Sequence, residues 1–264
     1  MSTIVAGIDV GSLTTKVLLM DAEDKGRIVS FRIGRSGSAY RNAVESIVAE
    51  TLDSAGLRLE DIRHTVSTGY GREIVSFSNS RVTEITCHGR GAKYFFPEVH
   101  TVIDIGGQDS KVISINDLGG VANFTMNDKC AAGTGRFLEV MASALEVEIG
   151  RLGELSAQSG QQVKVSSMCT VFAESEVISL LSKECSKSDI AAAIHEAIAR
   201  RITGMVGQVG LRERVVMVGG VAKNIGVVRS LEKMLGTSFL IPPEPQINGA
   251  LGAALIAAER LSQD

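Results

Sequence analysis

The sequence predicts an α/β fold built from two related lobes. Short apolar runs typical of strands alternate with amphipathic segments typical of helices along all 264 residues, which is the pattern of α/β proteins. A ten-residue pattern occurs twice, as IDVGSLTTKV at 8–17 and IDIGGQDSKV at 103–112. No Pro-, Gly- or Ser-rich linker divides the chain, so we expect the two lobes to pack together around a cleft.

The two copies of this repeat align at one constant offset. Asp9 matches Asp104 and Lys16 matches Lys111, and each copy reads as apolar run, Asp, glycine-containing turn and second apolar run. That order predicts two strands joined by a tight polar turn. We therefore expect a first lobe at 1–100 plus 247–264 and a second lobe at 101–246.

Hydrophobic spacing predicts the remaining elements. Residues 62–67, 82–85 and 215–218 resemble strands, and Cys87 and His88 are placed on a strand, where adjacent side chains face opposite ways. Helical spacing is found at 40–56, 136–147, 172–183, 189–210 and 247–261. The four histidines show no ligand spacing and are interpreted as structural. Glu174 and Glu176 are expected to cap the start of a helix.

Composition excludes several classes of function. The net charge is −3, aromatic residues make up 4% and Trp is absent, so neither an electrostatic nor a stacking surface for nucleic acid is expected. No segment approaches the roughly 18–20 apolar residues of a membrane span, and no leader pattern is found at the N-terminus. We expect a cytoplasmic protein, in which structural disulfides are rare.

Each repeat has the chemistry of a phosphate-binding loop. Glycines let backbone N–H groups approach phosphate oxygens, and a carboxylate such as Asp9 or Asp104 suits hydrated Mg²⁺. Neither a GxxxxGK[ST] loop nor a GxGxxG turn after the first strand is present. The polar groups of the two loops come from Ser12, Thr14, Thr15 and Lys16 and from Gly106, Gly107, Gln108 and Asp109.

The two hairpins and a third glycine turn, MVGGVAKN at 217–224, together resemble the actin/hexokinase/heat-shock-70 superfamily. That resemblance implies ATP held between duplicated lobes, with Gly219, Gly220 and Asn224 near the nucleoside. A sugar-type small-molecule kinase of the same superfamily is an alternative. A chaperone-like ATPase is disfavoured because no substrate-binding domain follows the lobes.

Two of the four cysteines precede predicted helices. Cys130 lies in NDKCAAGTGRF and Cys169 in SSMCTVFAESEV, and a helix N-terminus favours a thiolate. Thiolates ligate iron–sulfur clusters, but two per chain do not complete a four-thiolate site. A symmetric homodimer would complete it, as would Cys87 and Cys185 within one chain. The remaining alternative is that all four are inert buried thiols.

Seven motifs spread over essentially the whole chain resemble activators of 2-hydroxyacyl-CoA dehydratases and the related ATPase subunits of benzoyl-CoA reductase. They are GIDVGSLTTK, STGYGR, HTVIDIGGQDSKV, MNDKCAAGTGRFLEVMA, CTVFAESEVISLLS, MVGGVAKN and NGALGAA. The resemblance implies a homodimer with one [4Fe-4S] cluster ligated by Cys130 and Cys169 of each subunit. It also implies that ATP hydrolysis to ADP drives one low-potential electron into a dehydratase partner, and that flavodoxin or ferredoxin supplies the electron.

The resemblance further assigns site residues. Asp9, Asp104 and Gln108 are the expected catalytic residues, with Mg²⁺ at the carboxylates. Leu13 departs from the family pattern, where a shorter residue is common, but only its backbone N–H is expected to matter. The expected nucleotide-binding residues are Ser12, Leu13, Thr14, Thr15, Lys16, Gly106, Gly107, Gln108, Gly133, Thr134, Gly135, Gly219, Gly220, Asn224 and Gln246. A benzoyl-CoA reductase-type ATPase subunit stays an alternative to the dehydratase activator.

Overall fold

The computed structural model describes residues 3–24, 26–37, 39–166 and 169–262. The chain separates into two compact units. The first comprises Met1–Val99, Ile115–Ala122 and Pro243–Asp264, and the second comprises His100–Ser114 and Asn123–Pro242. Each unit has its own sheet and is described by itself.

The first unit is built on a five-stranded sheet of order β3-β2-β1-β4-β5. β1 pairs antiparallel with β2 and parallel with β4, so the sheet is mixed. Its strands are β1 (Ile4–Val10), β2 (Thr14–Asp21), β3 (Arg27–Arg35), β4 (Ile62–Thr68) and β5 (Ser80–Arg81).

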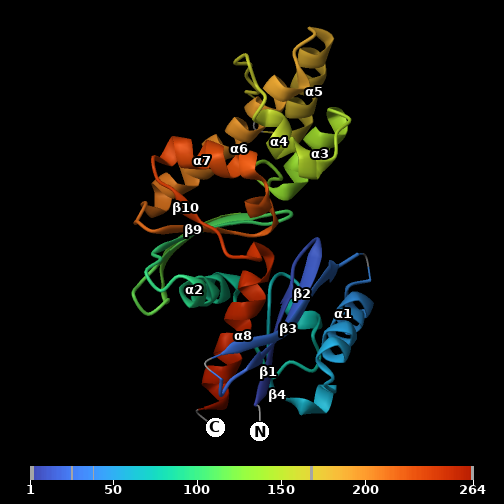
Figure 1. Ribbon diagram of the computed structural model, residues 1–264, viewed down its shortest axis with the longest axis vertical. Coiled ribbons are helices and arrows are strands. Elements are labelled where there is room, and N and C mark those ends of the chain that lie inside the picture. Colours follow the sequence, from blue (N-terminus) through green and yellow to red (C-terminus); the bar gives the residue numbers. More distant parts are fainter. Residues whose placement is uncertain (1–2, 25, 38, 167–168, 263–264) are drawn as a thin grey trace. The chain divides into compact units, whose positions relative to one another are not determined.

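Helices cover both faces of this sheet (Figure 1). Alternate β1 residues, such as Ile4 and Ile8, pack with α1 (Tyr40–Ala55), whereas Val5 packs with α8 (Asn248–Leu261). α2 (Glu84–Phe95) lies beside α8 on that second face. This two-residue alternation is what a strand buried on both faces requires. Short 3₁₀ turns lie at η1 (Leu59–Asp61), η2 (Arg72–Ile74) and η5 (Pro245–Ile247).

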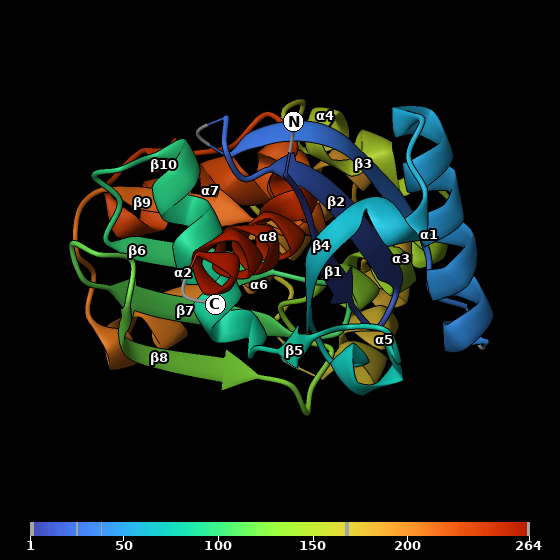
Figure 2. The ribbon, with the colours of Figure 1, turned by 90° about the horizontal axis from the view of Figure 1, so that it is seen from below.

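The second unit repeats the sheet. The strand order is β10-β9-β6-β7-β8, in which β6 pairs antiparallel with β7 and parallel with β9; Figure 2 shows β6, β7 and β8 side by side. The strands are β6 (Thr101–Ile105), β7 (Ser110–Ile115), β8 (Val121–Asn127), β9 (Val215–Val218) and β10 (Phe239–Leu240).

The helices of the second unit enclose a single large apolar core. Ile103 and Met217 contribute to it from the sheet, and Phe137 and Ile198 contribute from helices. The helices are α3 (Gly135–Ala144), α4 (Leu152–Ser156), α5 (Thr170–Ser182), α6 (Lys187–Val209) and α7 (Ile225–Leu235), with 3₁₀ turns η3 (Ile149–Arg151) and η4 (Gly220–Lys223).

The two sheets have the same topology when the second is read from β8 to β10. Each begins with an antiparallel hairpin, followed by a third strand on the outer side of that hairpin and a later strand parallel to the first. The predicted α/β class and the duplicated hairpins are therefore confirmed.

One predicted strand is wrong. Residues 82–85 are not extended throughout, because α2 begins at Glu84, and Cys87 and His88 therefore lie on a helix rather than on a strand. Thr83 is the N-cap, and its hydroxyl accepts a hydrogen bond from the Thr86 N–H at 3.4 Å. The cap and the helical burial pattern override the β-branched residues that favoured a strand.

Within the part of the chain that the structure describes, no helix is both long enough and apolar enough to cross a membrane.

Candidate nucleotide and cluster-ligand sites

The first predicted phosphate loop joins β1 to β2. Asp9 and Lys16 are cross-strand partners, and the Lys16 Nζ lies 3.1 Å from the Asp9 Oδ2. The Gly11 N–H closes the turn by donating to the Thr14 carbonyl at 3.1 Å. The turn residues 11–14 are only half-buried, so their backbone stays reachable by a ligand.

Hydroxyl groups of Ser36 and Tyr40 hydrogen-bond to the backbone of this loop. Ser36 donates its hydroxyl proton to the Gly11 carbonyl at 2.8 Å. It therefore accepts from Thr15 Oγ1, which lies 3.0 Å from its oxygen. The Tyr40 hydroxyl donates to the Ser12 carbonyl at 3.0 Å. Sequence analysis missed Ser36 and Tyr40, because nothing in their local pattern indicates a contact with residues more than twenty positions away.

The second predicted loop has the same cross-strand pair and one additional carboxylate. Lys111 is paired with Asp104 across the hairpin, with its Nζ 3.1 Å from Asp104 Oδ2 and 2.9 Å from Asp109 Oδ1. The Gly106 N–H closes the turn onto the Asp109 carbonyl at 2.9 Å. The Lys111 side chain is 2% exposed, compared with 14% for Lys16, so the charges at the second hairpin are the more deeply buried.

In each unit, a glycine with positive φ lies against the aspartate. Gly69 follows β4 with φ +83°, and a Cβ on it would lie within 2.4 Å of Asp9 Oδ1. Gly219 follows β9 with φ +84°, and a Cβ there would lie 2.6 Å from Asp104 Oδ1. Both positions require glycine for backbone conformation and for space. Gly219 was predicted as a site residue, whereas Gly69 was missed although it lies in the STGYGR motif.

The second hairpin is bonded directly to the start of α3. The Gly135 N–H donates to the Gly106 carbonyl and the Arg136 N–H donates to the Gly107 carbonyl, both at 2.8 Å. The Ser110 hydroxyl also donates to the Gly133 carbonyl at 2.7 Å. The structure thus brings together two groups of predicted nucleotide-binding residues, 106–107 and 133–135.

The other predicted nucleotide residues lie at several places. Gln108 is exposed at the tip of the second hairpin. Gly220 begins η4, and Asn224 caps α7 by accepting from the N–H groups of Gly226 and Val227 at 3.0 and 3.2 Å. Gln246 lies in η5, within the first unit.

Cys130 lies in the segment between β8 and α3. The Asn127 side chain donates from Nδ2 to the carbonyls of Cys130 and Ala132 at 2.8 and 3.1 Å, which fixes the backbone on both sides of Ala131. Cys130 is half-buried. The helix behind it begins at Gly135, several residues after the cysteine, so the expected placement directly before a helix is only approximate.

Cys169 is exposed and is the N-cap residue of α5. Its carbonyl accepts the Ala173 N–H at 2.9 Å, and its own side chain forms no capping hydrogen bond. Glu176 was expected to cap it, but its carboxylate binds Ser166 instead, accepting from the backbone N–H at 2.6 Å and from the hydroxyl at 2.7 Å.

The other two cysteines have different environments. Cys87 is fully buried in α2, and burial raises the pKa of its thiol to about 12, so it is unsuited to ligate a metal as thiolate. Cys185 is half-buried against the core of the second unit. Among residues 3–24, 26–37, 39–166 and 169–262, no three His, Cys, Asp or Glu side chains group to hold a metal ion.

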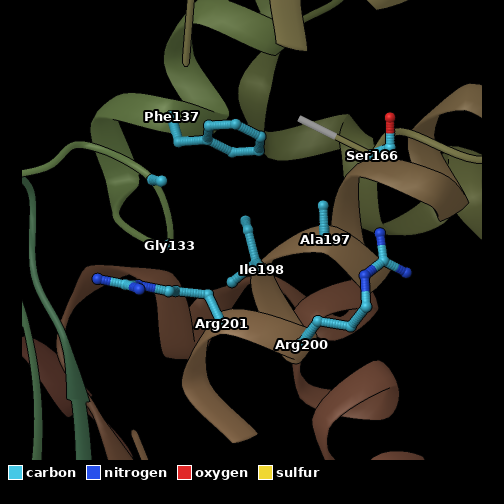
Figure 3. Close-up of a pocket in the computed structure, with 8 residues that line it drawn as sticks. Gly133, Phe137, Ser166, Ala197, Ile198, Arg200 and Arg201 are labelled. Carbon is cyan, nitrogen blue, oxygen red and sulfur yellow. The ribbon is translucent and has the colours of Figure 1, made fainter. Parts of the chain in front are cut away.

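A small cavity is lined by residues that follow Cys130 and by Ser166, which precedes Cys169 (Figure 3). Phe137 and Gly133 border it from the α3 side, and Ala197 and Ile198 point into it from α6. Its volume is about 10 Å³, which is room for about one water molecule. It is too small for a nucleotide.

Each of the two sheets carries a Lys–Asp pair on a glycine hairpin and a positive-φ glycine against the carboxylate. This repeated arrangement is typical of the duplicated ATPase fold of the actin/hexokinase type. The chain belongs to the BadF/BadG/BcrA/BcrD ATPase family, whose pattern matches residues 6–257.

Three relatives illustrate this membership. The (R)-2-hydroxyglutaryl-CoA dehydratase activating ATPase of Acidaminococcus fermentans is 48% identical over 100% of both chains. The crystal structure of component A of the (R)-2-hydroxyglutaryl-CoA dehydratase from that organism superposes with a TM-score of 0.95 and 46% identity, covering 99% of this chain and 100% of that one. The structure of the activator of the 2-hydroxyisocaproyl-CoA dehydratase from Clostridium difficile, solved with bound ADPNP, superposes with a TM-score of 0.92 and 43% identity. It covers 100% of this chain and 96% of that one.

Proposed function

We propose that this protein is an ATP-dependent activator that delivers one low-potential electron to a 2-hydroxyacyl-CoA dehydratase. The observation that carries the proposal is the bonding of the second phosphate hairpin to α3. Two backbone hydrogen bonds, from Gly135 and Arg136 to Gly106 and Gly107, join the hairpin to the helix behind Cys130. A change at the nucleotide is thereby transmitted to the segment that holds a candidate cluster ligand. The names of the relatives supply the class of partner.

The nucleotide is proposed to bind through both hairpins. Backbone N–H groups of residues 12–16 and 106–108 would contact phosphate oxygens, and residues 133–135, Gly219, Gly220, Asn224 and Gln246 would complete the site. Asp9 and Asp104 offer carboxylate oxygens of the kind that hydrated Mg²⁺ prefers. Each carboxylate is held by a lysine across its hairpin, which fixes its position for orienting the metal's waters.

Cys130 and Cys169 fit half of a four-thiolate ligand set. One is half-buried and the other exposed, and Cys169 lies at a helix N-terminus, where a thiolate is favoured. A [4Fe-4S] cluster, when bound, would hold and pass on one electron at a time. The sulfur atoms of this chain supply two ligands, and the two symmetry-equivalent cysteines of a second copy supply the others.

An exposed apolar face on α5 supports the homodimer. Val171, Phe172 and Ile178 are 67%, 66% and 53% exposed, and all three follow Cys169 on the same helix. Large apolar side chains on a helix surface mark interaction sites. We therefore propose that α5 packs against a second copy of the chain next to the cysteines.

Iron and sulfide quantification with EPR tests the cluster assignment. Anaerobically purified wild-type protein is expected to hold about two iron atoms per chain, as one [4Fe-4S] cluster per dimer requires. Cys130→Ala and Cys169→Ala should lose the cluster, whereas Cys185→Ala should keep it. A full iron content in Cys130→Ala would remove that residue from the ligand set.

Assays with a dehydratase partner test the activity. Reduced activator with Mg²⁺-ATP should activate a 2-hydroxyacyl-CoA dehydratase, and a non-hydrolysable analogue should not sustain the transfer. Flavodoxin or ferredoxin is the proposed donor, to be compared with a chemical reductant. A colourless protein that phosphorylates a sugar would overturn the proposal in favour of a kinase. The cytoplasmic location stays a prediction.

A further inference from the structure

The segment before Cys169 is held at two points in the second unit. Glu176, in the second turn of α5, accepts from the Ser166 backbone N–H through Oε2 at 2.6 Å and from the Ser166 hydroxyl through Oε1 at 2.7 Å. Each carboxylate oxygen therefore accepts a hydrogen bond from Ser166. Hydrogen bonds to an ionised acceptor are stronger than neutral ones, so Glu176 is a firm attachment for Ser166.

The residue before Ser166 is attached to a different helix. Arg200 of α6 donates from Nη2 to the Val165 carbonyl at 2.7 Å, and the Val165 side chain is fully buried in the core. Arg200 also lies 3.5 Å from Glu196, one turn earlier on α6. Figure 3 shows the Arg200 guanidinium turned toward Ser166. Adjacent residues 165 and 166 are thus anchored to α6 and α5.

Only two residues, 167 and 168, separate this anchored pair from Cys169 in the sequence. Cys169 itself is the N-cap of α5, which begins at Thr170. The cysteine is therefore bounded on one side by Ser166, attached to α5 by Glu176, and on the other by the first turn of the same helix. Such a short connection between two fixed points restricts where the cysteine backbone can lie.

The next residue on α6 contacts the other cysteine-bearing segment. A Cβ built on Gly133 would lie 3.0 Å from the Arg201 Cγ, so the stem of Arg201 packs directly under the loop that follows Cys130. Figure 3 shows Gly133 above Arg201, on the opposite side of the cavity from Ser166. Consecutive arginines on one helix thereby support both segments.

We propose that Glu176 and Arg200 are positioning residues for Cys169, and that α6 at residues 200–201 sets the spacing between the two cysteine-bearing segments within one chain. This proposal rests on the proposed cluster function only for the reason why Cys169 needs positioning. The hydrogen bonds from Ser166 and Arg200 themselves involve no ligand. Releasing Ser166 or Val165 would leave Cys169 exposed but poorly placed.

Two readouts test the proposal. The first is the rate at which Cys169 reacts with iodoacetamide in metal-free protein, followed by mass spectrometry. The second is the yield of cluster after anaerobic reconstitution, measured as iron per chain and by EPR. Glu176→Gln and Arg200→Gln are expected to change the Cys169 labelling rate at least threefold and to lower the cluster yield at least twofold. The labelling rates of the other cysteines should stay unchanged.

Matched variants separate positioning from charge and from general stability. Glu174→Gln removes the same charge from the same helix at a residue two positions away, and Arg229→Gln removes an exposed arginine from α7. Both should behave as wild type in the two readouts. Arg200→Lys keeps the charge but not the geometry of the guanidinium, and it should restore little of the cluster yield.

The outcomes distinguish this proposal from the cluster proposal. Unchanged Cys169 labelling and full cluster yield in Glu176→Gln and Arg200→Gln would overturn the positioning role. A wild-type protein that takes up no cluster would refute the proposed function, while the labelling experiment would still decide whether the two residues hold Cys169. A loss of thermal stability equal in the variants and their controls would assign the effects to folding.

Discussion

The backbone N–H of Gly135 donates to the carbonyl of Gly106 at 2.8 Å, and this bond joins the first residue of α3 to the second phosphate hairpin. Arg136 and Gly107 form a second bond of the same length beside it. The helix that follows the Cys130 segment therefore begins on the hairpin itself, without an intervening side chain.

Nucleotide binding should change hydrogen exchange at the start of α3. A ligand that draws the hairpin backbone toward phosphate alters the two bonds from Gly135 and Arg136, so these amides should show the largest change within α3. Hydrogen–deuterium exchange with ATP analogue, with ADP and without nucleotide would measure it. Amides near the end of α3, which bond within the helix, serve as the control, and equal exchange in all three states would contradict the coupling.

Gly219→Ala should abolish nucleotide binding and destabilise the protein by about 1–3 kcal/mol, because the side chain is strained at φ +84° and would meet the Ile105 carbonyl oxygen and Asp104 Oδ1. Gly236→Ala is the matched control, since Gly236 also has positive φ (+67°) but no atom lies within 4 Å of its Cβ position. Calorimetric titration with ATP would compare the two. Equal ATP affinity of the two variants would show that nucleotide binding does not depend on the space that Gly219 leaves beside Asp104.

Lys111→Met should be much more damaging than Lys16→Met. Removing Lys111 leaves the buried Asp104 without the lysine it shares with Asp109, and breaking a buried ion pair costs about 3–5 kcal/mol. Lys16 is more exposed, at 14%, and contacts one carboxylate, so its loss should cost less than the loss of Lys111. Chemical denaturation of both variants would give the difference, and equal losses would show that burial at the second hairpin has no energetic consequence.

The four thiols should react with iodoacetamide in the order of their exposure when the protein is metal-free. Cys169 is exposed and should react first, with Cys130 and Cys185 slower. Cys87 should stay unmodified even at pH 9, because burial raises the pKa of its thiol to about 12 and the thiolate is the reactive form. Mass spectrometry would follow each residue. In denaturant the differences should vanish, and rapid native labelling of Cys87 would contradict its buried position.

His195 should make the protein less stable as the pH falls from about 6.5 to about 4. Burial lowers the pKa of its imidazole from 6.5 to about 4, so in this window the unfolded chain binds a proton that the folded chain does not. The free energy of unfolding therefore decreases with falling pH, by up to about 3 kcal/mol for this residue. Thermal unfolding of wild type and His195→Gln would measure the pH slopes. The variant should have a flatter slope between these values, whatever its absolute stability, and an unchanged slope would refute the assignment.

The hairpins could be predicted from sequence because their determinants are local. Asp9 and Lys16, or Asp104 and Lys111, lie seven residues apart on either side of a glycine turn, and a tight turn alone fixes their cross-strand pairing. Cys130 and Cys169 were selected by motif, and their role as cluster ligands stays a prediction. The resemblance extended over the whole chain, and family membership confirms it.

Other parts of the site depend on contacts that no local pattern records. Glu176 resembled a helix cap by position, but its partner Ser166 precedes the helix. The strand predicted at 82–85 rested on β-branched residues, whereas the Thr83 cap and tertiary burial make the segment helical from Glu84. His88 is joined to Asn248, which donates from Nδ2 to the His88 carbonyl at 3.0 Å, and these residues are 160 positions apart.

The packing of α8 on β1 has a consequence for synthesis of the chain. A Cβ on Gly7 would overlap the Ala250 carbonyl and lie 2.5 Å from the Ala254 nitrogen, so the first strand and the last helix are in backbone contact. While the polypeptide is still emerging from the ribosome, one face of the first sheet has no covering helix. The segment from His100 to Pro242, by contrast, contains all of the second unit. The second unit is therefore synthesised before α8, whereas this face of the first sheet is covered only once α8 has emerged.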